Sequence, residues 1–161
     1  MIQYSAVCAF NEELDQVVLV HKLQPSWQLN KANFPGGKVE SCDGNGFDKF
    51  VNCASRELCE ETGLKIDPCM LSLFCVLHFA GGICYFFVTV ARINSAKTQE
   101  LEKIFIGNVD EILTKSTTRY DLTLLETMPN LPVLISIAKK VILTRDKSIY
   151  EIHERNFTFY I

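Results

Sequence analysis

The chain has 161 residues, of which 48% are apolar, 11% aromatic and 22% charged. This length predicts one folded domain over residues 1–161, and the eleven Phe, five Tyr and single Trp exclude wholesale disorder. The formal net charge of −3 argues against a duplex nucleic-acid binder, because such a protein shows a clear basic excess.

The seven cysteines are odd in number and include no Cys-x-x-Cys pair. Since no zinc-type spacing is present either, we predict reduced thiols in a cytoplasmic protein. The first ten residues, MIQYSAVCAF, contain neither a basic segment nor a long apolar one, so no secretory signal is expected. The three histidines, His21, His78 and His153, stand far apart in the sequence and are interpreted as structural.

The N-terminal part of the chain predicts two strands, a loop and a helix. The strands are residues 2–10 and 16–23, and a glycine-rich loop spans residues 31–46. Apolar residues then recur at helical spacing over residues 48–62, and Gly63 provides a natural stop.

Residues 68–91 contain no Asp, Glu, Lys or Arg, a length that could suggest a membrane helix. However, Gly81 and Gly82 divide this segment into two apolar halves rich in β-branched and aromatic residues. Two such halves joined by a two-residue Gly-Gly turn predict a buried hairpin, and His78 would be poorly tolerated in a membrane span. No membrane partner is therefore expected.

The C-terminal part predicts short alternating elements. We expect a strand over residues 102–106, helices over 109–115 and 131–143, and a closing strand or hairpin over 148–160. Helices intermixed with hairpin-connected strands predict an α/β or α+β fold, in which helices flank a mixed β-sheet.

The most informative segment is Arg56-Glu57-Leu58-Cys59-Glu60-Glu61-Thr62-Gly63-Leu64. On a helix, Glu57, Glu60 and Glu61 project from one face, and like charges at this spacing cost about 0.2–0.5 kcal/mol per pair. The helix dipole also disfavours negative charge near a C-terminus. A bound cation would explain the arrangement, since clustered carboxylates are ligands for Mg²⁺ or Mn²⁺. The alternative is an acidic helix face exposed to solvent.

Together with the preceding Phe34-Pro35-Gly36-Gly37-Lys38-Val39-Glu40, this segment resembles the Nudix box, which identifies the chain as similar to the Nudix hydrolase family. The family pattern is a glycine, five residues, a glutamate, seven residues, and then Arg-Glu-apolar-x-Glu-Glu-x-Gly-apolar. Residues 56–64 match the second half of this pattern at every specified position.

The first half of the box departs from the pattern. Asp43 follows Gly37 at the glutamate spacing, but twelve residues separate it from Arg56. Asp48 has the expected spacing to Arg56 but follows Gly37 by ten intervening residues. Extra residues therefore lie within residues 41–47, and either aspartate could stand for the family's glutamate.

The resemblance implies a Nudix-type α/β/α sandwich and roles for the matching residues. Glu57, Glu60 and Glu61 would bind Mg²⁺ or Mn²⁺, and Arg56 would orient Glu57. The Gly37 carbonyl and Glu40 would be further metal ligands, with one more carboxylate from outside the box. Candidates for this last carboxylate are Glu100 and Glu102, with Glu102 assigned to the metal, and then Asp110 and Glu111. Candidate substrate-binding residues are Trp27, Lys38 and Glu100, although Trp27 could equally be a core or rim residue.

The implied activity is hydrolysis of the diphosphate linkage in a nucleoside diphosphate-X compound, by attack of water on a phosphorus. The segments around Trp27 and residues 128–132 look like small MutT-like Nudix proteins, which favours a nucleoside triphosphate or a small nucleotide conjugate as substrate. ADP-ribose, a dinucleoside polyphosphate and an RNA cap stay open as substrates. The alternative function is a non-catalytic nucleotide sensor with a Nudix fold. A homodimer is compatible with the resemblance, with the apolar segment 83–91 as its edge.

Overall fold

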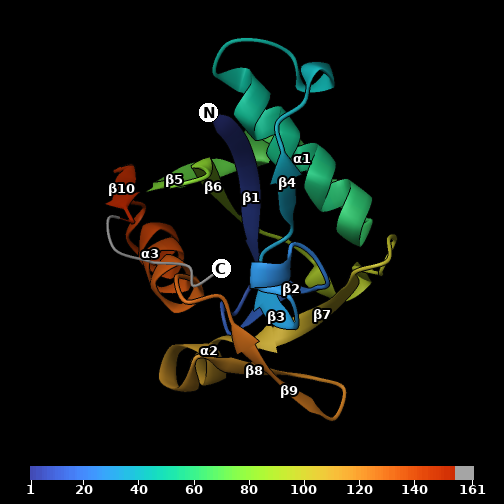
Figure 1. Cartoon of the computed structure of the whole chain (residues 1–161). Coiled ribbons are helices and arrows are strands. Elements are labelled where there is room, and N and C mark those ends of the chain that lie inside the picture. The colour runs from blue at the N-terminus through green and yellow to red at the C-terminus, as the bar shows by residue number, and fades with distance from the viewer. Residues whose placement is uncertain (155–161) are drawn as a thin grey trace.

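A mixed β-sheet runs through the centre of the molecule, and helices cover both of its faces (Figure 1). The computed structural model describes residues 1–154. Within them the strands are β1 (Ile2–Phe10), β2 (Gln16–Lys22), β3 (Lys31–Asn33), β4 (Gly36–Lys38), β5 (Ser72–Phe79), β6 (Gly82–Val90), β7 (Lys103–Asn108), β8 (Thr117–Tyr120), β9 (Thr123–Thr127) and β10 (Tyr150–His153). The helices are α1 (Asp48–Thr62), α2 (Val109–Lys115) and α3 (Leu131–Thr144), with 3-10 turns η1 (Ser26–Gln28), η2 (Ser41–Asp43), η3 (Pro68–Met70) and η4 (Ile93–Ser95).

The strand order is β10-β5-β6-β1-β2-β3-β9-β8, with β4 paired to β1 and β7 paired to β2. Parallel pairs join β1 to β6, β10 to β5, and β3 to β9, whereas the other pairs are antiparallel. The predicted mixed sheet flanked by helices is thereby confirmed.

Two apolar clusters, one on each face of the sheet, hold the layers together. Along β1, Val7 and Ala9 pack with the buried side of α1, while Cys8 and Phe10 pack with α2 and α3. Successive side chains of a strand point to opposite faces, so a strand buried on both faces serves both clusters. The central position of β1 thus fixes α1 on one face and α3 on the other.

The predicted apolar hairpin over residues 68–91 is confirmed, with a small correction to its turn. Ala80 and Gly81 form the turn, and Gly82 already pairs with Phe79 as the first residue of β6. A Cβ at Gly82 would overlap the carbonyl oxygen of Ile2, so the close approach of β1 requires glycine there. None of the helices in the described part of the chain is long and apolar enough to cross a membrane.

Several short elements differ from the sequence-based expectations. The predicted loop 31–46 contains β3 and β4, and the hairpin β8–β9 was not predicted. These strands have three to five residues each, too few for periodicity to reveal them. Of the predicted closing strand over 148–160, β10 covers Tyr150–His153, and residues 155–160 lie outside the described part. All seven cysteines lie in the described part and are free thiols.

Candidate functional site

The acidic side of α1 faces β4, and its three glutamates differ in exposure. The side chains of Glu57, Glu60 and Glu61 are 15%, 48% and 7% exposed. The opposite side of the helix carries Phe50, Ala54 and Leu58, which are buried against the sheet. This packing buries most of the Glu57 and Glu61 side chains. The alternative interpretation, an acidic helix face exposed to solvent, therefore does not apply to these two residues.

Two glycines of β4 allow these carboxylates to approach the backbone. A Cβ at Gly37 would overlap the carboxyl group of Glu57, and a Cβ at Gly36 would overlap the backbone of Ser5 and Ala6. The Gly36 amide donates a 2.7 Å hydrogen bond to Glu61 Oε2. The Gly-Gly pair is therefore needed for close packing between β1, β4 and α1.

Lys22 at the end of β2 links the acidic face to Glu102. Its Nζ lies 3.3 Å from Glu61 Oε1 and 2.5 Å from Glu102 Oε2. Burial acts to lower the pKa of Lys22, but the two carboxylates outweigh it and hold the pKa above its ordinary value. Glu102 Oε1 also accepts hydrogen bonds from the backbone amides of Leu23 and Gln24. Glu102 thus lies beside the acidic face, as a group that holds Lys22.

The electrostatics of this face favour a bound cation. Burial raises the pKa of Glu61 to about 7, although Lys22 and the Gly36 amide oppose the shift. Burial also raises the pKa of Glu57, with Arg56 opposing and Glu60 and Glu100 adding to the shift. Crowded, desolvated carboxylates of this kind are the oxygen ligands that Mg²⁺ and Mn²⁺ prefer. The donor set therefore fits the divalent metal expected for the Nudix box.

Asp43, not Asp48, is the acidic partner of Arg56. Arg56 Nε lies 2.8 Å from Asp43 Oδ1 and Arg56 Nη2 lies 3.1 Å from Oδ2, while Arg56 Nη1 contacts Glu57 and Glu60 at 2.8 Å each. Asp48 lies exposed in the first turn of α1. The hydrogen bonds from Arg56 hold the pKa of Asp43 below its usual value, with burial opposing them. The extra residues of the box consequently follow Asp43, as the loop 44–47 and the start of α1.

The structure brings some of the other predicted residues to the acidic face and places others elsewhere. Glu100 is exposed but close enough to Glu57 to raise its pKa. Glu40 is exposed and caps the turn η2. Lys38 is also exposed, and its backbone carbonyl accepts a 3.2 Å hydrogen bond from Arg56. Asp110 and Glu111 belong to α2, which packs against α3, β7 and β8 at the other end of the molecule from α1 (Figure 1).

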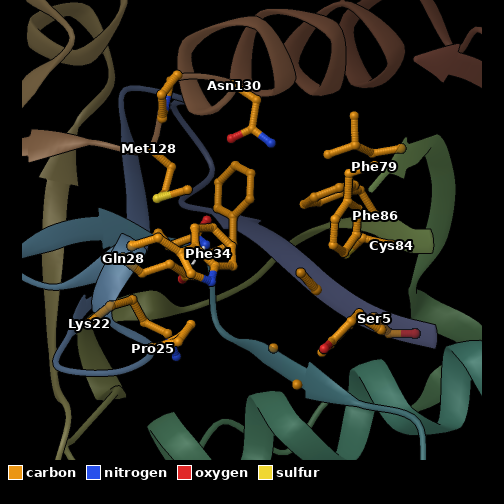
Figure 2. A pocket seen from close by; sticks show the side chains of 18 of the residues that line it. Ser5, Lys22, Pro25, Gln28, Phe34, Phe79, Cys84, Phe86, Met128 and Asn130 are labelled. Carbon is orange, nitrogen blue, oxygen red and sulfur yellow. Dashed lines mark hydrogen bonds between the residues drawn. The ribbon is translucent and has the colours of Figure 1, made fainter. Parts of the chain in front are cut away.

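A pocket of about 440 Å³ opens next to the acidic face (Figure 2). Its apolar walls come from strands β5 and β6 and the segments before β4 and α3, with Leu77, Phe79, Phe86, Phe34 and Met128 as the main contributors. Its polar lining includes the side-chain amides of Gln28, Asn33 and Asn130, together with the charged residues Lys22 and Glu154. Trp27 lies in η1 with 41% exposure and also lines the pocket, the position expected of a candidate substrate-binding residue.

The sequence analysis did not name Lys22 or the individual amides that line the pocket, although Asn130 lies in the segment 128–132 and Gln28 lies beside Trp27, two segments noted for their similarity to MutT-like proteins. Lys22 follows the buried run Val17–Val20, and a lysine at the end of such a strand is the only local signal that it offered. The amides carry no signal of their own, because their segments meet only after the sheet and α3 are assembled. Cys59, inside the box, is half-buried and free, as expected for a small packing residue.

Comparison with known proteins agrees with the box and the fold. A family model described as NUDIX domain matches residues 1–119, and the chain belongs to the Nudix family. None of the curated proteins gives a significant match.

Solved structures share the fold at low sequence identity. A MutT structure from a study of Aliivibrio salmonicida and Vibrio cholerae is 20% identical, with a TM-score of 0.58 over 86% of this chain and 96% of the other. MutT of Bacillus halodurans is 18% identical, with a TM-score of 0.59 over 95% and 90% of the two chains. The NUDIX domain of Shewanella oneidensis NrtR, solved with ADP ribose, is 14% identical with a TM-score of 0.66 over 88% of each chain. The predicted Nudix-type sandwich is thereby confirmed.

Proposed function

We propose that this chain hydrolyses the diphosphate linkage of a nucleoside diphosphate-X compound in the presence of Mg²⁺ or Mn²⁺, with a nucleoside triphosphate or a small nucleotide conjugate as substrate. The observation that supports this most directly is that pocket and acidic face share a wall. Gly36, Gly37 and Lys22 line the pocket. The same three residues contact Glu57 and Glu61. A base held in the pocket would therefore have its phosphates beside the carboxylates.

The chemistry of the pocket suits a nucleobase. Its volume of about 440 Å³ lies within the ~300–1,000 Å³ usual for small-molecule sites. Gln28 Oε1 accepts a 3.1 Å hydrogen bond from Asn33, whereas the side-chain amide of Asn130 has no hydrogen-bond partner among residues 1–154. Asn130 points into the pocket (Figure 2), so its donor and acceptor are available to the edge of a base.

The residues of the acidic face would have separate roles in this reaction. Glu57, Glu60 and Glu61 would hold the metal ions, which when bound supply charge neutralisation and a water of lowered pKa. Arg56 keeps Glu57 and Glu60 in place through its two 2.8 Å contacts. Lys22 presents a positive charge toward the pocket side of the acidic face. A carboxylate that is not bound to the metal, on the same face or among residues 100–111, would accept the proton from the attacking water.

The substitution Glu60→Gln tests this function with little risk to the fold, because Glu60 is half exposed and Gln can still accept a hydrogen bond from Arg56. Glu12→Gln is the matched control, an exposed glutamate in the β1–β2 turn. Release of phosphate or pyrophosphate is measured with Mg²⁺ or Mn²⁺. The substrates are the (d)NTPs, ADP-ribose, NADH, dinucleoside polyphosphates and capped RNA. We expect turnover of one substrate class, lost in Glu60→Gln and kept in the control.

The same panel separates the enzyme from the sensor. A sensor would bind one of these nucleotides with no turnover in the unmodified chain, whereas an enzyme loses turnover but keeps its folded state in Glu60→Gln. Absence of turnover across the panel, together with tight binding of one compound, would overturn the proposed hydrolysis and favour the sensor.

A further inference from the structure

The pairing of β5 with β10 gathers two histidines and a glutamate on one face of the sheet edge. His153 is paired with His78 in the parallel register, and Glu151 precedes His153 by two positions on the same face of β10. His78 Nε2 lies 3.2 Å from Glu151 Oε1, and His153 Nε2 lies 4.0 Å from Glu151 Oε2. His78 and Glu151 are 73 positions apart, so their places in the sequence give no sign of a cluster.

We propose that His78, Glu151 and His153 form a binding site for a transition-metal ion such as Zn²⁺, separate from the acidic face of α1. One ligand atom from each residue lies within 4.8 Å of the other two. Two imidazole nitrogens and one carboxylate oxygen are a donor set typical of Zn²⁺, whereas Mg²⁺ prefers oxygen ligands alone. The fourth position of a tetrahedral ion is open to water or another ligand.

The geometry needs only side-chain rotation to accept the ion. Bonds of about 2.0–2.1 Å to a tetrahedral Zn²⁺ place ligand atoms about 3.3 Å apart. The 3.2 Å distance from His78 Nε2 to Glu151 Oε1 already matches this spacing, whereas His153 Nε2, 4.0 Å from Glu151 Oε2, must move closer. The two imidazole rings stack with centroids 4.4 Å apart and planes 8° from parallel. They must turn out of this stack, and the side-chain exposures of 31% for His78 and 50% for His153 leave room for that rotation.

The site has a structural consequence for the substrate pocket. β10 is the edge strand of the sheet and pairs with β5 alone among the described strands. Leu77 and Phe79, on either side of His78, line the pocket, and Glu154, which follows His153, lines it as well. The Glu154 amide donates a 2.9 Å hydrogen bond to the His78 carbonyl. An ion bound across the two strands would therefore fasten β10 against the pocket wall.

Zinc affinity, measured by competition with a chromophoric chelator, tests the proposal independently of any hydrolysis. For this assay the protein is prepared without a histidine tag, and Mg²⁺ is added in excess so that it occupies the carboxylate sites of α1. The exposed Cys42 and Cys69 are replaced by Ser, since free thiols would also bind Zn²⁺. We expect one Zn²⁺ per chain, with affinity weakened at least about ten-fold in His78→Ala and in His153→Ala.

His21→Ala is the matched control, because His21 is the remaining histidine and contacts Asn30 and Tyr120 instead. It should bind Zn²⁺ as tightly as the parent. Equal Zn²⁺ affinity in the parent and all three histidine variants would overturn the proposal. If a histidine variant fails to fold, Glu151→Gln provides the same test, because Glu151 is 64% exposed and can be changed without disturbing the core.

Amide hydrogen exchange gives a second readout. Zn²⁺ should slow exchange in residues 150–154 of the parent, because it joins the edge strand to β5, and should leave His153→Ala unaffected. Unchanged exchange in the parent at saturating Zn²⁺ would overturn the fastening of β10. Neither readout depends on turnover, so this proposal can fail while the proposed hydrolase activity stands, and the reverse.

Discussion

The pair between Asp43 and Arg56 predicts a large stability loss for Asp43→Ala. The Asp43 side chain is 1% exposed and that of Arg56 is 21% exposed. The substitution removes both hydrogen bonds to Arg56 and leaves the Glu40 amide without its 2.7 Å acceptor. Breaking a buried ion pair from one side costs about 3–5 kcal/mol. Because Arg56 keeps two other carboxylates and part of its solvent contact, we expect a loss of about 2–3 kcal/mol in the free energy of unfolding.

Urea unfolding without ligand measures this loss, with Asp48→Ala as the matched control. Asp48 is exposed in the first turn of α1, where its interaction with the helix dipole contributes about 0.3–1 kcal/mol. The m-values should stay equal, so that the shift in midpoint reports stability alone. If Asp43→Ala costs no more than Asp48→Ala, the assignment of Asp43 as the partner of Arg56 is wrong.

The pH dependence gives an additional check on the same pair. Because the folded-state pKa of Asp43 is lowered, its stabilising contribution is complete above the ordinary aspartate pKa of about 4. It is lost as the pH falls through the lowered folded value. The difference in stability between the parent and Asp43→Ala should therefore be full at neutral pH and shrink in acid. A difference that stays constant into strong acid would mean that the carboxylate charge contributes nothing.

Three further predictions concern the acidic face. In Gly37→Ala the new methyl group would overlap the Glu57 carboxyl, so we expect about 1–3 kcal/mol of destabilisation in thermal unfolding, and an unchanged melting temperature would contradict the contact. Lys22→Met leaves Glu61 and Glu102 without their buried cation, so we expect the free energy of unfolding in urea to fall by about 2–4 kcal/mol, with part of the loss recovered when Mg²⁺ is added. An unchanged free energy of unfolding would refute the role of Lys22 in neutralising these carboxylates. Since the pKa of Glu61 is about 7, Mg²⁺ binding near pH 7 should release protons, detected by calorimetry in buffers of different ionisation heat, and the release should vanish at higher pH.

Local patterns in the sequence were sufficient for the long elements and for one half of the site. The predicted helices over 48–62 and 109–115 match α1 and α2, and the predicted strand 2–10 matches β1. Such elements repeat one apolar period over several turns or residues, which is information held within the segment itself. The order of Arg56 and the three glutamates on one helix face is local in the same sense. Hence the sequence predicted the acidic face and its similarity to the Nudix box.

The remaining features depend on contacts between segments that are distant in the chain. Both Asp43 and Asp48 satisfied part of the box spacing, and only the packing of η2 against α1 selects Asp43. Lys22 reaches Glu61 across 39 positions, and His78 meets His153 only because β10 joins β5 in one particular register. A one-residue shift of β10 in that register would place His153 on the opposite face of the sheet from His78. Partner choice, burial and pKa are set by this three-dimensional neighbourhood, because the desolvation and the charges that determine them come from residues that the local sequence does not contain.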